Sequence, residues 1–226
     1  SLEGRNEIHR ISERHAFFLI KAALELGQEK GNAPWIHKTK WPNGWLPIDS
    51  YKKTVDELVT IGLVYDWEWL RAAIIANGGI RFSCLIALMP TESSSKAAGM
   101  PNGPYPLRAL SLKKSDENSV LDWVATDSDL LANDYEIGYD AEPVEIIKSY
   151  AIMQKFTDHS ISADTYKDRS ENVMLSDKAI LTEYLTMVKY GVKSKYYSNT
   201  LTNAKDSSGK KKEAVVEENC GDSCKL

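Results

Sequence analysis

The stretch KAILTEYLTMVKYGVKSKYYSN, residues 178–199, decides the fold of this chain. Apolar residues recur at helical spacing through its first half: Ile180, Leu181, Tyr184, Leu185 and Val188. Gly191 follows as a residue suited to a helix C-terminal cap, and the next residues, VKSKYY, have the character of a strand. The stretch therefore predicts a helix over Lys178 to Tyr190 that leads directly into a strand.

The same order of helix and strand occurs twice more upstream. Residues 145–156 carry a helical apolar stripe and precede HSISADTY, which alternates like a strand. A helix predicted over Trp67 to Ala76 ends at two glycines and precedes IRFSCLIALM, residues 80–89, which is predicted as a buried strand with Cys84 as inert core. Three such units in series imply parallel strands joined by crossover helices, so the predicted fold class is α/β.

Other segments complete this outline. A long amphipathic helix is expected over Ile8 to Leu26, followed by a loop rich in proline and glycine with Trp35, Trp41 and Trp45 as packing anchors. Residues 113–139 are polar and are expected to be weakly ordered. From residue 201 onward the apolar periodicity is lost, which predicts a flexible C-terminal tail.

Composition excludes several classes of protein. The 226 residues include 28 basic and 32 acidic side chains, and the net charge of -4 argues against a general nucleic-acid binder. No run of 18 apolar residues and no signal-peptide pattern is present, so a cytoplasmic protein with no membrane association is expected. Three cysteines do not make a secreted disulfide framework. The chain starts at Ser1 rather than methionine, and we expect it to be part of a longer chain.

The segment MPTESSSKAAG, residues 89–99, directly follows the predicted strand 80–89. Its hydroxyls fall where a helix would begin, and hydroxyls together with free backbone N–H groups at that place can bind a phosphate. The simpler alternative is that Thr91 or Ser93 only caps the helix, and Glu92 would repel a phosphate unless it faces away or binds a sugar hydroxyl. Both interpretations stay open at this point.

Two cysteines, Cys220 and Cys224, lie in the predicted tail with three small or polar residues between them. This spacing allows the two sulfurs to reach disulfide distance, and an exposed segment would give exchange partners access to them. A zinc site is a weaker alternative because it needs about four ligands and the nearest histidine, His159, is some sixty residues away. No other histidine pattern suggests a metal site, and the pair can also have no function at all.

The adjacent phenols Tyr196 and Tyr197 stand at the end of the last predicted strand. Neighbouring side chains of a regular strand point to opposite faces, so the two rings can stack only if the backbone bends there. The following residues, SNT, are a plausible break. The alternative is an ordinary strand with its aromatic side chains on opposite faces.

Taken together and in this order, these features resemble the C-terminal portion of the large (catalytic, alpha) subunit of class I ribonucleoside-diphosphate reductases. The resemblance covers nearly the whole chain. It is carried by ERHAFFLIKAALELGQEKGNAPW, GWLPIDSYKK, LIALMPTESSSKAAG, IMQKFTDHSISADTY, VKYGVKSKYYSNT and the two-cysteine tail. It implies that residues 1–200 form the second half of a ten-stranded α/β barrel and that residues 201–226 are a disordered, redox-active tail.

The resemblance also implies roles for individual residues. The family's substrate-phosphate site maps to Pro90, Thr91, Glu92, Ser93 and Ser94. The family's stacked tyrosines, which relay an oxidising equivalent by proton-coupled steps, map to Tyr196 and Tyr197. The family's tail dithiol, which reduces the active-site disulfide after each turnover, maps to Cys220 and Cys224. The family reaction converts ribonucleoside diphosphates to 2'-deoxyribonucleoside diphosphates for DNA synthesis.

Partners and cofactors follow from the same resemblance. The radical would come from a metal-containing small (beta) subunit, whose C-terminal peptide would dock near the helix over Lys178 to Tyr190. Thioredoxin or glutaredoxin would restore the tail dithiol, and this segment itself would hold no cofactor or metal. The family needs five cysteines and this chain has three, so the remaining cysteines and the ATP and deoxynucleotide effector sites would belong to an N-terminal part. The chain alone would then be inactive. The alternative function is a non-catalytic thiol-exchange or docking module.

Overall fold

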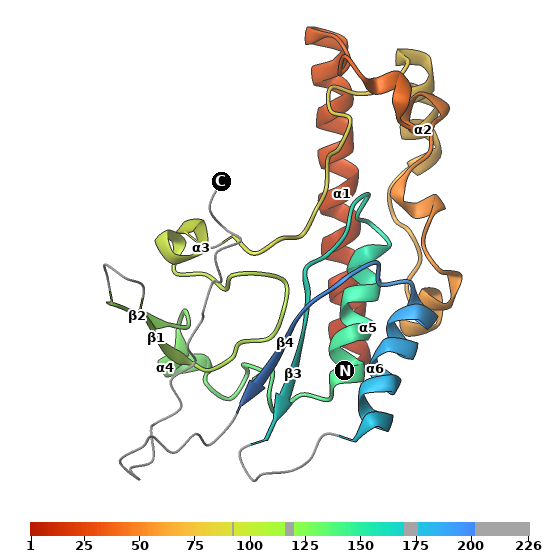
Figure 1. Ribbon diagram of the computed structural model, residues 1–226. Helices are drawn as coiled ribbons and strands as arrows, with labels where there is room; N and C mark the ends of the chain where they lie inside the picture. The colour runs from red at the N-terminus through yellow and green to blue at the C-terminus, as the bar shows by residue number, and fades with distance from the viewer. Residues whose placement is uncertain (92, 116–119, 170–175, 202–226) are drawn as a thin grey trace, which may run out of the picture.

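The computed structural model describes residues 1–91, 93–115, 120–169 and 176–201 (Figure 1). The helices are α1 (Leu2–Lys30), α2 (Trp67–Asn77), α3 (Ser93–Ala98), α4 (Ser128–Leu131), α5 (Pro143–Gln154) and α6 (Asp177–Tyr190). The strands are β1 (Ser111–Ser115), β2 (Val120–Val124), β3 (Ala163–Asp168) and β4 (Lys195–Leu201). Short 3₁₀ helices at Ile36–Lys38, Trp41–Asn43, Pro47–Asp49 and Lys53–Leu58 connect α1 to α2.

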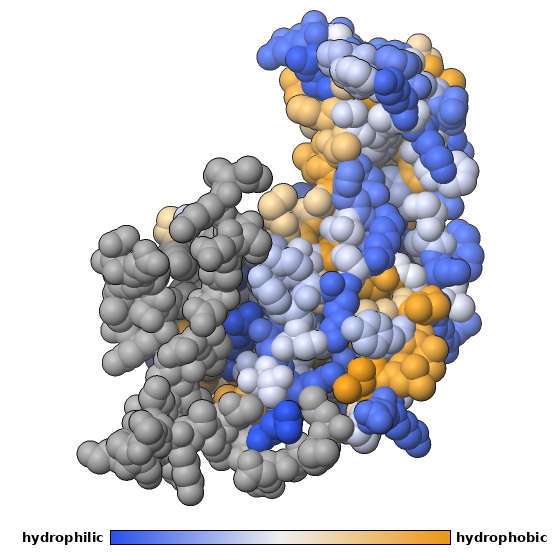
Figure 2. All heavy atoms as spheres, viewed as in Figure 1, coloured by the Kyte–Doolittle hydropathy of each residue, from blue (hydrophilic) through white to orange (hydrophobic). Residues whose placement is uncertain are grey.

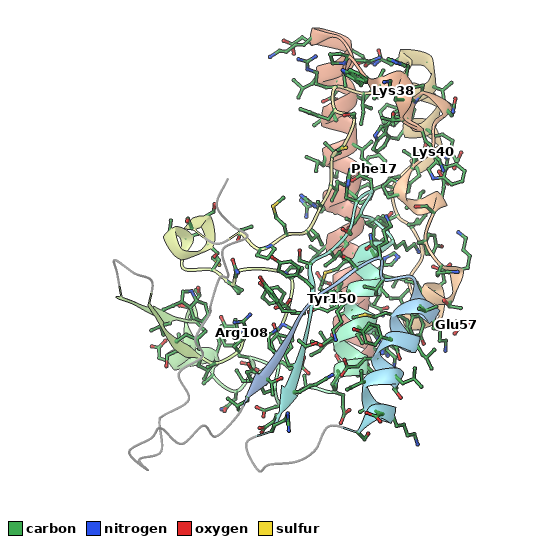
Figure 3. All side chains as sticks on the ribbon, in the orientation of Figure 1. Phe17, Lys38, Lys40, Glu57, Arg108 and Tyr150 are labelled. Carbon is green, nitrogen blue, oxygen red and sulfur yellow. The ribbon has the colours of Figure 1, made fainter. Side chains whose placement is uncertain are left out.

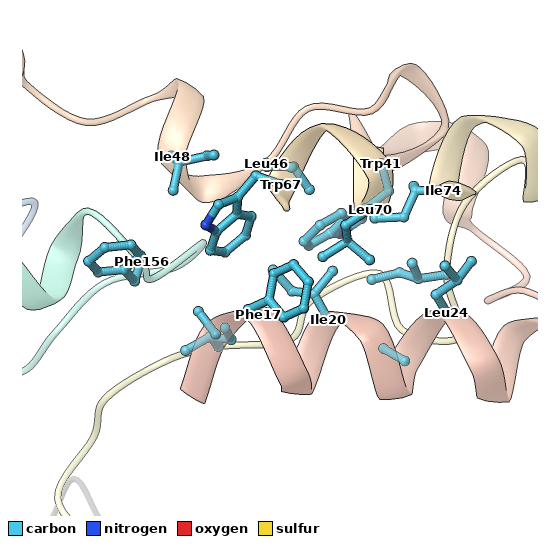
Figure 4. Close-up of a cluster of buried hydrophobic side chains, with 14 of the residues drawn as sticks. Phe17, Ile20, Leu24, Trp41, Leu46, Ile48, Trp67, Leu70, Ile74 and Phe156 are labelled. Carbon is cyan, nitrogen blue, oxygen red and sulfur yellow. The ribbon is translucent and has the colours of Figure 1, made fainter. Parts of the chain in front are cut away.

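Helix α1 is the longest helix among the described residues and packs against both α2 and α5 (Figure 1). Its inward face contributes Phe17, Ile20 and Leu24 to the largest core cluster, where they meet Trp67 and Leu70 of α2 (Figure 4). Trp41 completes this core as predicted. Trp35 and Trp45 are wrong as packing anchors, because their side chains are exposed and lie beside lysine ammonium groups.

Two predicted glycine caps agree with the structure, whereas α1 is longer at both ends than the helix predicted over Ile8 to Leu26. Gly78 caps α2 and Gly191 caps α6, and both glycines have the left-handed backbone conformation, with φ of 69° and 73°. Glycine adopts this conformation without the steric cost that a Cβ atom brings. The α6–β4 unit and the α5–β3 unit are confirmed, and β3 and β4 pair in parallel as predicted.

Segment 80–89 is not the regular buried strand that the sequence predicts. Only Leu88 forms an isolated parallel bridge, to Ile161, where Leu88 N–H donates to the Ser160 carbonyl at 3.2 Å. Cys84 is exposed, so its assignment to the core is wrong. The physical reason is that the segment has one short neighbour on one side within the described residues, which gives too few ladder hydrogen bonds to keep ten residues extended.

The described residues form an α/β fold with two small sheets and no closed barrel. One sheet is the parallel pair β3–β4 and the other is the antiparallel hairpin β1–β2. This hairpin lies in the polar region 113–139 that was expected to be weakly ordered. Its largest buried side chain is Trp123, which packs against Leu107 and Ala125 in a small separate core cluster. None of the helices in the described ranges has the length and apolar character that a membrane crossing requires.

A polar cluster, buried at His9 and Lys155 and exposed at Asp56, joins α1, the end of α5 and the 3₁₀ helix before α2. The ammonium of Lys155 lies 2.8 Å from Asp56 Oδ1 and 3.3 Å from His9 Nε2. His9 is fully buried. Burial and the positive charge of Lys155 lower the pKa of His9 from 6.5 to about 4. The folded protein therefore holds this imidazole neutral.

This cluster predicts a loss of stability in mild acid. Because the pKa of His9 is lower in the folded state, the unfolded chain binds the proton first as the pH falls below about 6.5. The stabilisation is fully present above that pH and is lost progressively down to about pH 4. Urea unfolding should show about 2–3 kcal/mol less stability at pH 4.5 than at pH 7 from this group alone. The variant His9→Gln should lack this component, whereas His15→Gln, an exposed site on the same helix, should keep it. If the free energy of unfolding depends equally on pH in the wild type and in His9→Gln, the acid destabilisation does not come from His9.

Candidate functional site

The side chains of Tyr196 and Tyr197 lie against each other at the start of β4. Their ring centroids are 4.1 Å apart at an interplanar angle of 50°, and the Tyr197 hydroxyl donates to the Tyr196 hydroxyl at 3.3 Å. Both side chains are nearly half exposed, at 47% and 45%. The alternative in which the two rings occupy opposite faces of a strand is therefore wrong.

A shift in strand register brings the rings together. Ala163 pairs with Lys195, whereas Thr165 pairs with Ser198, so one intervening residue of β3 faces two intervening residues of β4. The tyrosines both lie opposite the one intervening residue, Asp164. An extra residue of this kind bends the strand and re-aims its side chains, and it is uncommon in parallel pairs. The backbone bend that contact between the two rings requires is thus present.

Asp164 is the residue around which this irregularity is built. Its side chain is buried, its Oδ1 accepts the backbone N–H of Tyr197 at 3.1 Å, and its Oδ2 accepts the Asn199 side-chain amide at 3.0 Å. The Arg108 guanidinium lies 3.5 Å from the same Oδ2. Burial raises the pKa of the Asp164 carboxyl, and the hydrogen bonds from Asn199 and Tyr197 partly oppose this effect.

Further tyrosines surround the same strand. The Tyr150 hydroxyl, from α5, donates to the Asp164 carbonyl at 2.9 Å, and the ring of Tyr166 packs edge-on against Tyr139. In Figure 3 Arg108 and Tyr150 approach the β3–β4 pair from opposite sides. Burial raises the pKa of Tyr150 above its ordinary value, so this phenol is protonated and acts as a hydrogen-bond donor.

The hydroxyl-rich segment begins on the other side of the β3 chain. Its residues Ser93 and Ser94 open the short helix α3 with exposed side chains, and Pro90 is half-buried. Thr91 is tied to Asn102: its N–H donates to the Asn102 carbonyl at 2.8 Å and its hydroxyl at 3.1 Å. Glu92 lies outside the described residues.

The register relates this segment to the tyrosine pair. Leu88 pairs with Ile161 on one side and Lys195 pairs with Ala163 on the other, and both pairings are parallel. The chain leading into Thr91 and the strand carrying the tyrosines therefore flank the same strand and run in the same direction. Because β3 lies between them, the two flanking chains are two strand spacings apart, which amounts to about 10 Å. The structure brings the two predicted sites to one end of the sheet.

Helix α6 presents an apolar stripe beside the tyrosines. The exposed side chains at positions i, i+3, i+4 and i+7 are Leu181, Tyr184, Leu185 and Val188. Figure 2 shows hydrophobic side chains gathered over this helix. Its inner face carries Glu183, whose carboxylate lies 3.0 Å from Lys167 Nζ and 3.7 Å from Lys195 Nζ. Because Lys195 directly precedes the tyrosine pair, this buried cluster links α6 to the start of β4.

Two of the predicted site residues lie in the C-terminal tail, and two candidate residues of the site were not predicted from the sequence. Cys220 and Cys224 lie outside the described residues. Asp164 and Arg108 were not found from the sequence, because a lone charged residue in an alternating segment reads as an ordinary exposed strand position. Asn199 had a weak signal as a turn former after the tyrosines.

Comparisons with known proteins identify the family of the chain. The family model described as "Ribonucleotide reductase, barrel domain" matches residues 1–128. The chain is 36% identical over 99% of its length to ribonucleoside-diphosphate reductase 1 subunit alpha from both Salmonella typhimurium and Escherichia coli. It is 35% identical over 92% of its length to ribonucleoside-diphosphate reductase subunit alpha of Enterobacteria phage T4.

The chain spans only part of these relatives. It covers 30% of the length of the two bacterial proteins and 28% of the phage protein. The family model nevertheless matches more than half of the chain, from its first residue through the hydroxyl-rich segment and into the β1–β2 hairpin. The chain belongs to the ribonucleotide reductase barrel-domain family.

Proposed function

We propose that this chain is part of the catalytic subunit of a ribonucleoside-diphosphate reductase, which reduces ribonucleoside diphosphates to 2'-deoxyribonucleoside diphosphates by a radical mechanism. Residues 1–200 would form the C-terminal half of the catalytic barrel and residues 201–226 the redox-active tail. The observation that carries the proposal is the tyrosine pair, because the strand irregularity holds two exposed, oxidisable phenols in contact, with their hydroxyl oxygens 3.3 Å apart.

The geometry of Tyr196 and Tyr197 suits a radical relay. When one phenol is a tyrosyl radical, the other can donate its hydroxyl hydrogen, so that one O–H bond breaks, one forms, and one electron accompanies the proton. The two oxygens are 3.3 Å apart, close to the range in which a proton can be passed directly. The oxidising equivalent would enter from a metal-containing small subunit and continue toward an active-site cysteine in the part of the relatives that this chain does not cover.

The segment over Pro90 to Ser94 would hold the substrate diphosphate. The exposed hydroxyls of Ser93 and Ser94 lie at the start of α3, and Asn102 fixes the preceding residue, Thr91. Hydroxyl donors and backbone N–H groups bind phosphate oxygens well. Glu92 would bind a sugar hydroxyl rather than a phosphate. This assignment is supported by the shared end of the sheet on which the segment and the tyrosines lie.

The tail dithiol, Cys220 and Cys224, would return two electrons to the active-site disulfide after each turnover, and thioredoxin or glutaredoxin would in turn reduce it. ATP and deoxynucleoside triphosphate effectors would bind the N-terminal part of the subunit. The small subunit would dock through a peptide on the apolar stripe of α6, which lies next to the strand that carries the relay.

This docking assignment makes a testable prediction. Leu185→Asp places a charge in the middle of the α6 stripe and should weaken small-subunit binding by about tenfold or more, because a desolvated apolar contact is lost and a carboxylate must be buried. Thr182→Asp adds the same charge to an exposed position of the same helix outside the stripe and should change the dissociation constant by less than about threefold. Isothermal titration of the large subunit with the small subunit measures both. Equal effects of the two variants would refute the stripe as the docking site.

The whole proposal is tested by reconstitution. The chain is produced joined to, or together with, the N-terminal part that the relatives contain, and formation of deoxyribonucleoside diphosphate is measured with the small subunit and thioredoxin. Product formation that depends on this chain supports the proposal. A folded complex that exchanges thiols with thioredoxin but forms no product would favour the alternative, a non-catalytic thiol-exchange or docking module.

A further inference from the structure

We propose that Asp164 is a positioning residue for the tyrosine pair: its buried carboxylate holds the backbone of Tyr197 in the register shift that places both phenols on one side of β4. This inference deepens the proposed function and rests on it for its catalytic consequence. Its structural part, the dependence of ring contact on Asp164, stands independently.

The first support is where the Tyr197 N–H group goes. In a regular parallel ladder, a strand N–H group donates to a carbonyl of the neighbouring strand. Here the Tyr197 N–H donates to Asp164 Oδ1 at 3.1 Å, so a side chain takes the place of the backbone partner at the irregular position. A carboxylate makes a stronger acceptor than a neutral carbonyl, and this bond connects the strand to the residue that the two tyrosines face.

The second support is that the Asp164 carboxylate also accepts a hydrogen bond from a β4 residue that follows the irregularity. Asn199, two residues after Tyr197, donates from its side-chain amide to Asp164 Oδ2 at 3.0 Å and to the Thr165 carbonyl at 3.4 Å. The two carboxylate oxygens thus bind β4 at two points and fix the length of chain between them. Tyr196 and Tyr197 are thereby kept opposite the single β3 residue Asp164.

The third support is the charge that accompanies the carboxylate. Asp164 is 1% exposed, and a buried carboxylate is costly unless it is paired and hydrogen-bonded. Arg108, whose side chain is only 12% exposed, lies 3.5 Å from Oδ2. A buried ion pair is weak evidence for stability, but it is well suited to specifying one register against another. Regular pairing, without the extra residue of β4, would place the two rings on opposite faces of the strand.

The catalytic consequence follows from distance. The phenol oxygens are 3.3 Å apart, and a displacement of about 1 Å at a reacting contact can cost about 100-fold in rate. Asp164 touches no hydroxyl of the pair; it acts through the backbone of Tyr197. Loss of the carboxylate should therefore lower kcat and leave the KM for the nucleotide almost unchanged.

The test places 3-fluorotyrosine at position 197 of the full-length large subunit and records its ¹⁹F resonance without the small subunit. The ring of Tyr196 shifts this resonance, and Tyr196→Leu supplies the reference for a ring that is not stacked. Asp164→Ala should move the resonance at least halfway to that reference. Asp164→Asn should stay near the wild-type position, because its amide oxygen still accepts the Tyr197 N–H and the Asn199 amide can rotate to accept from the new NH₂ group.

Controls separate positioning from general destabilisation. Glu13 is a carboxylate as buried as Asp164 and accepts the N–H groups of Val64, Tyr65 and Trp67, far from the tyrosines in the sequence. Glu13→Gln should lower stability and leave the resonance in place. If Asp164→Ala does not fold, Asn199→Ala removes one of the two attachment points and should move the resonance part of the way. A folded Asp164→Ala or Asn199→Ala protein with the wild-type resonance overturns the proposal.

Turnover measured on the same variants distinguishes this inference from the proposed function. With the small subunit and thioredoxin present, kcat of Asp164→Ala should fall about 100-fold with KM within about twofold, and Asp164→Asn should recover most of that loss. A displaced resonance combined with wild-type kcat would confirm positioning by Asp164 while refuting the tyrosine pair as the relay.

Discussion

Replacing Tyr196 or Tyr197 by phenylalanine is expected to reduce turnover of the reconstituted enzyme to below about one thousandth of the wild-type rate, equivalent to about 4 kcal/mol of activation free energy. Phenylalanine keeps the ring and its packing but has no hydroxyl hydrogen to give up. The proposed relay would then be interrupted between the two hydroxyl oxygens, which are 3.3 Å apart in the structure. Steady-state deoxynucleotide formation is the measurement.

Binding of the substrate should be unaffected by either substitution. The diphosphate would be held on the segment over Pro90 to Ser94, which approaches β3 from the side opposite β4. Equilibrium binding of a ribonucleoside diphosphate should therefore give the wild-type dissociation constant. The matched control is Tyr135→Phe, which removes a phenol that donates to the Thr126 carbonyl and should retain turnover. Normal turnover of Tyr196→Phe or Tyr197→Phe would refute the relay role.

Replacing Cys220 or Cys224 by serine is expected to lower thioredoxin-driven turnover about 100-fold or more, while a small dithiol still supports the reaction. In the proposed exchange one tail thiolate attacks the active-site disulfide and forms a mixed disulfide. The second thiolate then displaces the active-site sulfur, and a tail disulfide is left for thioredoxin to reduce. Serine can carry out neither step, whereas dithiothreitol can reach the active-site disulfide directly.

The chain between β4 and the tail cysteines gives the dithiol a long reach. Eighteen residues lie between Leu201, the last described residue, and Cys220, and a fully extended chain from Leu201 to Cys220 spans about 65 Å. A single turnover of the pre-reduced Cys220→Ser enzyme should be normal, because the tail dithiol is needed only to prepare the next cycle. The control is Cys84→Ser, because Cys84 is an exposed thiol outside the tail. This variant should keep wild-type turnover with thioredoxin and with dithiothreitol. Equal loss of activity with both reductants would count against a reducing arm.

Local patterns predicted much of the fold because they depend on residues close in sequence. The helical stripes and the caps at Gly78 and Gly191 were predictable, since spacing and the conformational freedom of glycine act within a few residues. Segment 80–89 was predicted wrongly as a strand, because apolar character does not show whether neighbouring strands are available. Trp123 was overlooked, because one buried side chain leaves no periodic signal.

The candidate site likewise has features that the sequence predicts and features that only the tertiary structure shows. Two adjacent phenols, a run of hydroxyls and two tail cysteines can be found from the sequence, because each is a set of neighbouring residues. Contact between the rings of Tyr196 and Tyr197 is decided by how β4 is aligned with β3, whose residues lie some thirty positions earlier in the chain. The carboxylate of Asp164 accepts hydrogen bonds from Tyr197 and Asn199 of the paired strand, which are more than thirty residues away in the sequence. The sequence by itself determined which chemical groups are available, and the tertiary structure decided their contact, because strand register is set by long-range hydrogen bonds and burial rather than by local propensity.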